Sequence, residues 1–118
     1  MKTHHSINYL EFKAPDLEKI KVFYTNAFGW EFTDYGPDYT AFTDGTLEGG
    51  FEKGEVQKGA GPLVILYSNN LEESVATVTQ NGGAVVRPIF AFPGGKRFHF
   101  TDPGGQELAI WSEGNKEE

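Results

Sequence analysis

Hydrophobic and polar positions along the first half of the chain predict one strand, one helix and three further strands. Residues 7–12 (INYLEF) alternate between apolar and polar side chains, as a half-buried strand does. The following segment, LEKIKVFYTNAF, carries apolar residues at helical spacing, with Asp16 as its expected N-cap and Gly29 as the residue that ends it. Three short segments between residues 31 and 52 predict strands separated by turns. This half of the chain therefore predicts a βαβββ unit.

The second half of the chain repeats this order of elements. Adding 54 to the residue numbers maps the first strand onto residues 63–67 (LVILY), the cap Asp16 onto Asn70 and the helix-ending Gly29 onto Gly83. The motif YTAFTD recurs as RFHFTD at an offset of 58 in residue number, and the last strands, LEGGFE and ELAIW, align with a gap of one or two positions. Matching motifs in the same order indicate a duplication. The sequence therefore predicts an α+β fold of two tandem βαβββ modules.

Composition restricts the class of protein further. A single domain of 118 residues accommodates both modules, about residues 5–54 and 60–113, with residues 113–118 as a polar tail. The net charge of -7, from 10 basic and 17 acidic residues, argues against nucleic acid or an anionic membrane as a partner. No cysteine is present, which excludes disulfides, Cys-ligated zinc and thiol nucleophiles. No secretory signal and no apolar run of the ~20 residues that a membrane span needs is visible, so we expect a cytoplasmic protein.

Three stretches of the sequence resemble those of a known superfamily. They are APDLEKIKVFYTNAFGW, NNLEESVATVTQNGGAVV and FHFTDPGGQELAIW, and the likeness extends over about residues 7–112. They resemble the vicinal oxygen chelate superfamily, which includes glyoxalase I, bleomycin and fosfomycin resistance proteins and extradiol dioxygenases. The resemblance implies that the modules form a curved mixed sheet around a central cleft, and that the protein is a homodimer. It leaves open the ligand, and whether modules pair within one chain or between two.

Metal-dependent members of the superfamily hold a divalent ion in this cleft through His, Glu or Gln at four positions. By the resemblance, the first position falls on Tyr9 and its equivalent in the second module on Leu63. The carboxylate position of the last strand falls on Ala109, and the remaining position falls within Glu48–Gly50, where the gap leaves the residue open. Because Leu63 and Ala109 cannot bind a metal, we expect no metal ion and no other cofactor, with a divalent metal as the disfavoured alternative.

The predicted strands also indicate which side chains face the cleft, because side chains alternate across a strand. Leu10 and Phe12 should pack under the first helix, which leaves Tyr9 and Glu11 on the other face. The same alternation on the other strands predicts an aromatic lining with a few polar groups, which suits a small organic ligand. The candidate ligand-binding residues are Tyr9, Glu11, Glu48, Leu63, Tyr67, Arg97, His99, Ala109 and Trp111.

Three functions are open for such a cleft. The first, which we prefer, is a metal-free pocket that binds a small organic molecule, as in the drug-resistance branch of the superfamily. The second is an enzyme, either a metal-dependent lyase, isomerase or dioxygenase, or a metal-free acid–base catalyst that uses Glu11 with His99 or Tyr9. The third is an accessory domain with a vestigial pocket. Glu11 and His99 are the candidate catalytic residues of the second function.

Overall fold

The structure, a computed structural model, describes residues 2–59 and 61–113. These residues form two compact units that divide between Val56 and Gln57, and each unit is described by itself. The units contain the two modules that the sequence repeat predicts. The expected polar tail lies, except for its first residue, outside the described residues.

Each module consists of one helix and four strands in the order βαβββ. The elements of module 1 are β1 (Tyr9–Ala14), α1 (Leu17–Phe28), β2 (Glu31–Asp34), β3 (Tyr39–Thr43) and β4 (Glu48–Lys53). Those of module 2 are β5 (Val64–Tyr67), α2 (Leu71–Gln80), β6 (Ala84–Phe92), β7 (Gly95–Thr101) and β8 (Glu107–Glu113). The prediction of an α+β fold built from two tandem βαβββ modules is confirmed, while the central cleft between the modules stays a prediction.

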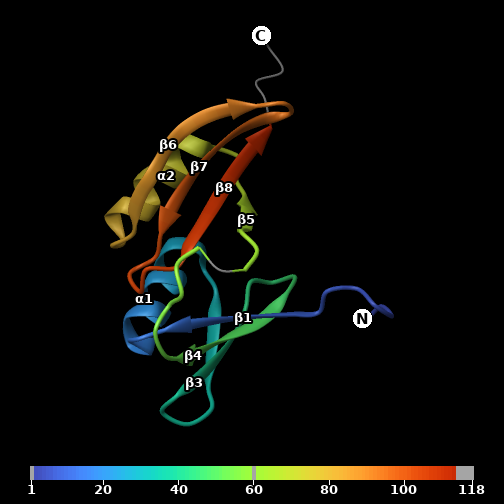
Figure 1. Ribbon diagram of the computed structural model, residues 1–118, viewed down its shortest axis with the longest axis vertical. Coiled ribbons are helices and arrows are strands. Elements are labelled where there is room, and N and C mark those ends of the chain that lie inside the picture. Colours follow the sequence, from blue (N-terminus) through green and yellow to red (C-terminus); the bar gives the residue numbers. More distant parts are fainter. Residues whose placement is uncertain (1, 60, 114–118) are drawn as a thin grey trace. The chain divides into compact units, whose positions relative to one another are not determined.

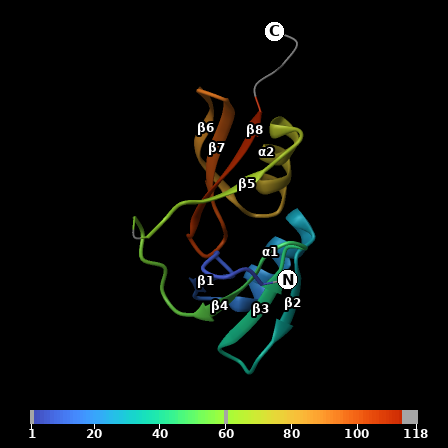
Figure 2. The same cartoon turned by 90° about the vertical axis from the view of Figure 1, so that its right-hand side faces the viewer.

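The two sheets have the same mixed topology (Figure 1, Figure 2). Module 1 has the strand order β1-β4-β3-β2, and module 2 has the order β5-β8-β7-β6. In each sheet the first and last strands of the module are parallel neighbours, and the other pairs are antiparallel. One face of each sheet packs on the helix of its module, so the opposite face is left for other contacts.

Local sequence signals set the ends of both helices. The side chains of Asp16 and Asn70 each accept a hydrogen bond from the backbone N–H three residues later, at 3.2 and 3.1 Å, and so cap α1 and α2 as predicted. Gly29 ends α1 in the left-handed conformation, with φ of 76°. The second helix ends at Gln80 with Asn81 as its C-cap, ahead of the glycine pair that the repeat suggested. In the described part of the chain, neither helix has the length and apolar character needed to cross a membrane.

The core of each module lies between the helix and one face of the sheet. In module 1 it is aromatic: the Trp30 ring stacks on Tyr24 at 4.4 Å and on Phe42 at 4.6 Å. In module 2 it is formed by Phe98 and Phe100, which are fully buried, together with aliphatic side chains. Burying one large side chain of this kind stabilises a fold by roughly 1.5–3 kcal/mol. The predicted alternation is confirmed, because Phe42, Phe98 and Phe100 occupy buried, helix-facing positions of β3 and β7.

Strand pairing shows how the two sequence halves correspond. Glu11 pairs with Gly50 in module 1, and Ile65, the counterpart of Glu11 in the repeat, pairs with Ala109 in module 2. The last strands are therefore equivalent at an offset of 59, from Gly50 to Ala109. This offset exceeds the 58 of the preceding motif by one, so the gap predicted from the sequence is a single position in the turn. Leu63, which the sequence placed in the strand, lies just before β5.

The turn before the last strand is closed in the same way in both modules. One carboxylate oxygen of Asp44 accepts two backbone N–H bonds, at 2.8 and 2.6 Å, and one oxygen of Asp102 accepts two at 2.9 and 3.0 Å. Hydrogen bonds from nearby backbone N–H groups to an Asp side chain are typical of turns. Asp44 is exposed, whereas Asp102 is only 4% exposed. The Phe-Thr-Asp motif therefore has the same structural role in both modules, because each copy closes a turn.

The edge strand β6 departs from regular pairing. Arg87 pairs with His99 and Phe90 pairs with Arg97, so β6 carries one extra residue between these pairs, and another between Val85 and Arg87. These irregularities are β-bulges, which re-aim side chains at sheet edges. As a result, Arg87 and Phe90 lie on the same face of the sheet as His99 and Arg97.

Candidate ligand-binding site

The face of the module 1 sheet away from α1 carries two phenols and a carboxylate in one hydrogen-bonded group. The hydroxyl oxygens of Tyr9 and Tyr39 lie 2.6 Å apart, and the Tyr39 hydroxyl donates to Glu11 Oε1 at 3.1 Å. Burial raises the pKa of Tyr39 above its usual range, and the bonds to Tyr9 and Glu11 raise this pKa further. Tyr39 is therefore a neutral donor that joins the two predicted site residues.

A glycine makes room for this group. A Cβ atom built on Gly50 would collide with the Tyr39 ring and hydroxyl and would lie 2.8 Å from the Tyr9 hydroxyl. The Tyr39 phenol thus lies over the backbone of β4, where a side chain at position 50 would otherwise stand. Because Gly50 pairs with Glu11, the glycine, the two phenols and the carboxylate form one local unit.

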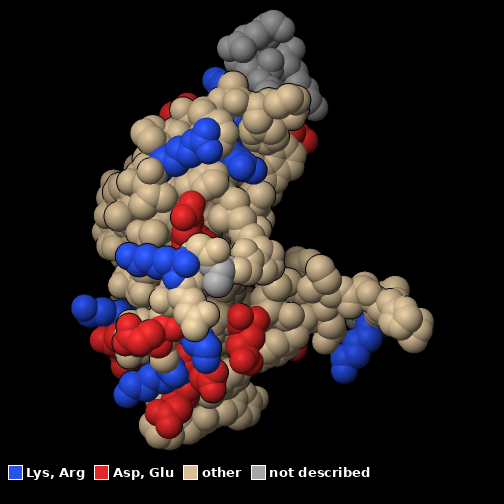
Figure 3. Space-filling view, viewed as in Figure 1, with Lys and Arg blue, Asp and Glu red and all other residues tan. Residues whose placement is uncertain are grey.

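Two lysines of module 1 are engaged in ion pairs. Lys13 Nζ lies 2.8 Å from Glu52 Oε1, and Lys21 Nζ lies 2.9 Å from both Glu18 and Asp34 carboxylate oxygens. The hydrogen bond from Lys21 holds the pKa of Asp34 below its usual range. On the face shown in Figure 3, acidic and basic side chains are intermixed over this module. These lysines therefore balance carboxylates and are not gathered into a basic patch.

The four positions assigned to metal ligands do not carry a donor set that fits a divalent ion. Strand pairing makes Gly50 the equivalent of Ala109, so the open position falls on Gly50 and not on Glu48. Glycine, alanine and the leucine at position 63 offer no side-chain donor, and the Tyr9 hydroxyl is already hydrogen-bonded. Within residues 2–59 and 61–113, no three His, Asp or Glu side chains lie together as a metal site requires.

On module 2, aromatic rings line the sheet face away from α2. Tyr67 and Trp111 pair across β5 and β8, and their rings meet edge to face at 5.2 Å. The Phe92 ring lies 6.4 Å from Trp111, and the Phe90 ring lies 5.8 Å from the imidazole of His99. Tyr67 is 51% exposed and Trp111 is half-buried. Partly exposed rings in mutual contact provide the flat apolar surface that binds organic ligands in many proteins.

His99 lies within this aromatic face and is held by a carboxylate. Its Nδ1 lies 2.8 Å from Glu107 Oε2, its residue is only 7% exposed, and its Nε2 is buried with no hydrogen-bond partner among the described residues. A carboxylate can only accept here, so Nδ1 carries the proton and donates it. In the neutral imidazole, this leaves Nε2 as an unused acceptor. The carboxylate partner of His99 is therefore Glu107, whereas the expected acid–base partner, Glu11, bonds Tyr39 in module 1.

Two arginines lie beside His99 on the same face. The Arg87 guanidinium lies 3.7 Å from the centre of the Phe90 ring, and that of Arg97 lies 5.5 Å from Phe90 and 5.7 Å from Phe92. Rings attract cations at such distances. The Nε atom of Arg97 is buried and has no hydrogen-bond partner among the described residues. Two buried polar atoms, on Arg97 and His99, are thus left unsatisfied on one side of one strand.

The structure brings some predicted site residues together and adds others. Tyr67, Arg97, His99, Ala109 and Trp111 share one face of module 2, and Tyr9 and Glu11 share one face of module 1. Sequence reasoning missed Tyr39, Phe90, Phe92 and Arg87. Alternation along the last strand also predicts Glu107 on the face of Ala109 and Trp111, although Glu107 is not among the candidate ligand-binding residues. The β6 residues gave no such signal, because two bulges interrupt the alternation.

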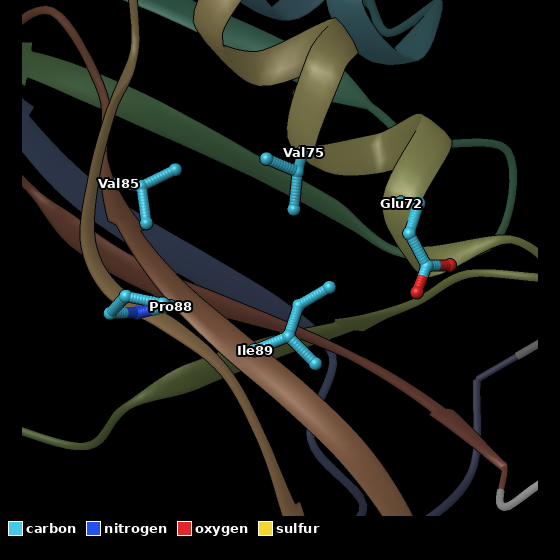
Figure 4. A pocket seen from close by; sticks show the side chains of 5 residues that line it. All are labelled: Glu72, Val75, Val85, Pro88 and Ile89. Atoms are coloured by element: carbon cyan, nitrogen blue, oxygen red, sulfur yellow. The ribbon is translucent and has the colours of Figure 1, made fainter.

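A separate pocket opens on the other side of the module 2 sheet (Figure 4). It has a volume of about 410 Å³ and lies between α2 and β6. Its lining, which the sequence did not single out, is Glu72, Val75, Val85, Pro88 and Ile89. This pocket lacks paired polar groups of the kind found around His99. It is therefore an apolar pocket that must be distinguished from the aromatic face in any binding experiment.

Paired βαβββ modules that each leave one sheet face open define a class of small α+β proteins. The model of the Glyoxalase/Bleomycin resistance protein/Dioxygenase superfamily matches residues 6–110, and the chain belongs to this superfamily. The resemblance drawn from the sequence is thereby confirmed. None of the curated proteins matches the chain.

Solved structures share the fold at low sequence identity. A fosfomycin resistance protein from Listeria monocytogenes, a mutant in complex with Mn(II) and a dihydroxypropylphosphonic acid, has a TM-score of 0.80 and 16% identity, covering 98% of this chain and 94% of its own. A glyoxalase/bleomycin resistance protein/dioxygenase family enzyme from Burkholderia phytofirmans PsJN has a TM-score of 0.77 and 14% identity, covering 90% and 97%. A lactoylglutathione lyase from Agrobacterium tumefaciens has a TM-score of 0.71 and 17% identity, covering 94% and 96%. These likenesses show the fold.

Proposed function

We propose that this protein binds a small organic molecule on the aromatic face of module 2 without a metal ion. The observation that carries the proposal is the pair of buried, unpartnered atoms, His99 Nε2 and Arg97 Nε, within a lining of aromatic rings. A buried polar group without a partner costs about 1–3 kcal/mol, so a ligand that satisfies both atoms recovers that free energy on binding. Membership of a superfamily with drug-resistance and lyase branches supports a small-molecule ligand.

The absence of a resident metal is part of the proposal and rests on the donor set. Of the positions equivalent to metal ligands, only Tyr9 carries a side-chain donor, and that hydroxyl is already hydrogen-bonded. We expect elemental analysis of the purified protein to find no stoichiometric transition metal. A metal present at one equivalent, and lost in Tyr9→Phe, would overturn this part.

Binding to the aromatic face can be tested with two exposed tyrosines. A library of small organic molecules is screened by thermal shift, and the hits are mapped by amide NMR. Tyr67→Leu should weaken binding at least about tenfold, because it removes the ring that meets Trp111. Tyr35→Leu, on a tyrosine that is 65% exposed in module 1, is the matched control and should leave binding unchanged. Hits that shift the residues lining the α2–β6 pocket instead, or that ignore Tyr67→Leu, would refute the proposed site.

A second candidate function is metal-free acid–base catalysis. It is favoured by the contact between His99 and Glu107, because a carboxylate that holds an imidazole in one tautomer leaves the other nitrogen as a proton acceptor. The test is solvent deuterium uptake at carbon in any ligand that binds. Glu107→Gln should slow the uptake by about 10²-fold or more, which is the range general-base catalysis supplies. Glu11→Gln should leave it unchanged; uptake that persists in His99→Gln would rule out this function.

We also propose that the protein is a homodimer, as the superfamily resemblance implies, and that it is cytoplasmic. Light scattering coupled to size-exclusion chromatography should give twice the chain mass of 13.1 kDa. A monomer at all accessible concentrations would contradict the proposal.

A further inference from the structure

The two arginines of module 2 have no ion-pair partner within residues 2–59 and 61–113. The guanidinium groups of Arg87 and Arg97 both lie against the Phe90 ring, at 3.7 and 5.5 Å from its centre, and neither forms an ion pair with a described carboxylate. Two acidic side chains of β8 lie on this face and both are engaged elsewhere: Glu107 is bonded to His99, and Glu113 accepts a hydrogen bond from the Tyr67 hydroxyl. The two like charges repel each other, and an anion bound beside them would offset this repulsion.

The geometry of Arg97 favours a planar anion. Its guanidinium is held against two rings, and its Nε–H is buried and unused. A guanidinium binds a carboxylate best through two parallel N–H donors, one of which is Nε–H in the side-on arrangement. The unused Nε–H therefore lies on the edge of Arg97 that carboxylates prefer.

His99 adds a second hydrogen-bonding group at a defined distance from Arg97. Arg97 and His99 stand two positions apart on β7, so their side chains leave the same face of the sheet about 6.5 Å apart along the strand. The unused His99 Nε2 accepts a hydrogen bond from a hydroxyl or N–H group. The rings of Trp111 and Phe92 flank this stretch and suit a flat molecule.

We infer that the ligand of module 2 is a flat organic anion, whose carboxylate binds Arg97 with Arg87 nearby, and whose remote hydroxyl donates to His99 Nε2. This inference rests on the proposed binding function and specifies the class of ligand. It also explains why a protein with net charge -7 places two arginines around one ring on this face.

The experiment uses pairs of probes that differ in one group. The acids 4-hydroxybenzoate and 4-hydroxycinnamate are compared with their neutral amides, and 4-hydroxybenzoate is compared with benzoate, by amide NMR titration of the full chain. Each acid should bind at least about tenfold more tightly than its amide, since a charge-assisted hydrogen bond is worth about that factor. The hydroxyl should add several-fold. Shifts should centre on Trp111, Arg97 and His99.

Variants then assign the preference to Arg97. In Arg97→Gln the acid and its amide should bind equally, and Arg97→Lys, which keeps the charge but loses Nε–H, should retain only part of the preference. Lys96→Gln, which removes one positive charge from the adjacent position on the other face of β7, is the matched control and should keep the preference.

The outcomes separate the two proposals. Equal binding of acids and amides on the aromatic face would overturn the anion inference and leave the binding function standing. Acids that bind with shifts away from Trp111, or that keep their preference in Arg97→Gln, would also overturn the inference. Failure of every acid probe would overturn it as well, whereas the binding function fails only if the neutral library also yields no hit on this face.

Discussion

Two neighbouring glycines of β4 should respond very differently to the same substitution. A Cβ on Gly49 would collide with the backbone oxygen of Leu10 and would approach the Phe42 ring at 2.6 Å, whereas a Cβ on Gly50 would meet the far end of the Tyr39 side chain. A backbone atom inside a paired sheet cannot move away without distorting the sheet. A phenol at the sheet surface can swing into solvent.

The expected costs follow from these contacts. In Gly50→Ala the displaced Tyr39 loses two hydrogen bonds, each worth about 0.5–1.5 kcal/mol. The lower flexibility of alanine in a strand offsets about 0.5–1 kcal/mol of that loss. We therefore expect Gly50→Ala to lower the free energy of unfolding by about 1 kcal/mol. Gly49→Ala overpacks the β1–β4 contact and should cost about 3 kcal/mol, the upper part of the range for overpacked cores.

Tryptophan fluorescence can follow this module by itself. Trp30 lies in module 1 and Trp111 in module 2, so urea unfolding in a Trp111→Phe background reports on module 1. Tyrosinate absorbance provides a second readout. Because the pKa of Tyr39 is raised, this phenol should ionise above the usual range of tyrosine in the wild type and at lower pH in Gly50→Ala.

The raised pKa of Tyr39 also determines how the stability of module 1 changes with pH. The folded-state pKa of Tyr39 lies above the unfolded value of about 10. The contribution of Tyr39 to the free energy of unfolding is therefore complete below a pH of about 10, and it is lost as the pH rises through the folded-state pKa. The reasoning fails if Gly50→Ala costs as much as Gly49→Ala, or if the late ionisation persists in Gly50→Ala.

Further predictions concern the turns, an ion pair and the core. Asp102→Ala should lower the free energy of unfolding by about 2–4 kcal/mol, because two backbone N–H groups lose a buried acceptor. Asp44→Ala should lower it by only about 1 kcal/mol, because water can replace this exposed acceptor. Equal losses of the two variants in urea titrations would refute the role of burial. Lys21→Met should return the pKa of Asp34 toward its usual value in a carboxyl NMR titration. The stability that the Lys21–Asp34 pair supplies above pH ~4 is lost as the pH falls through the folded-state pKa of Asp34. An unchanged Asp34 titration would contradict the assignment of the lowered pKa to Lys21. Phe51→Ala should cost about 3–5 kcal/mol, since the ring is fully buried, and a loss below about 1 kcal/mol by calorimetry would show that the core collapses around it.

Much of the scaffold follows from local sequence, because the signals involved act over a few residues. Asp16 and Asn70 cap helices by accepting a nearby N–H, and Asp44 and Asp102 close turns in the same way. Gly29 takes a conformation that other residues avoid. Alternation along each strand then separates helix-facing from open positions, so the two-module architecture was predictable.

The site was less predictable because it depends on which strands become neighbours. Tyr39 lies over Gly50 only because β3 and β4 pair in one register, and nothing local to Tyr39 indicates that a side chain is missing from the next strand. His99 meets Glu107 diagonally across β7 and β8. Two bulges bring Phe90 opposite Arg97, a pairing that a regular alternation would not predict.

The equivalence of Tyr39 and Arg97, which stand at matching points of β3 and β7, has a consequence for how such proteins change over time. Helix-facing positions in both halves are constrained by packing, so they keep their chemical character. The open faces do not pack on a helix, and one copy holds a neutral phenol where the other holds a guanidinium. Duplication thus allows the open face of one module to change its side chains while the open face of the other keeps its own. Each face can be redesigned without changing the helix and sheet that support it.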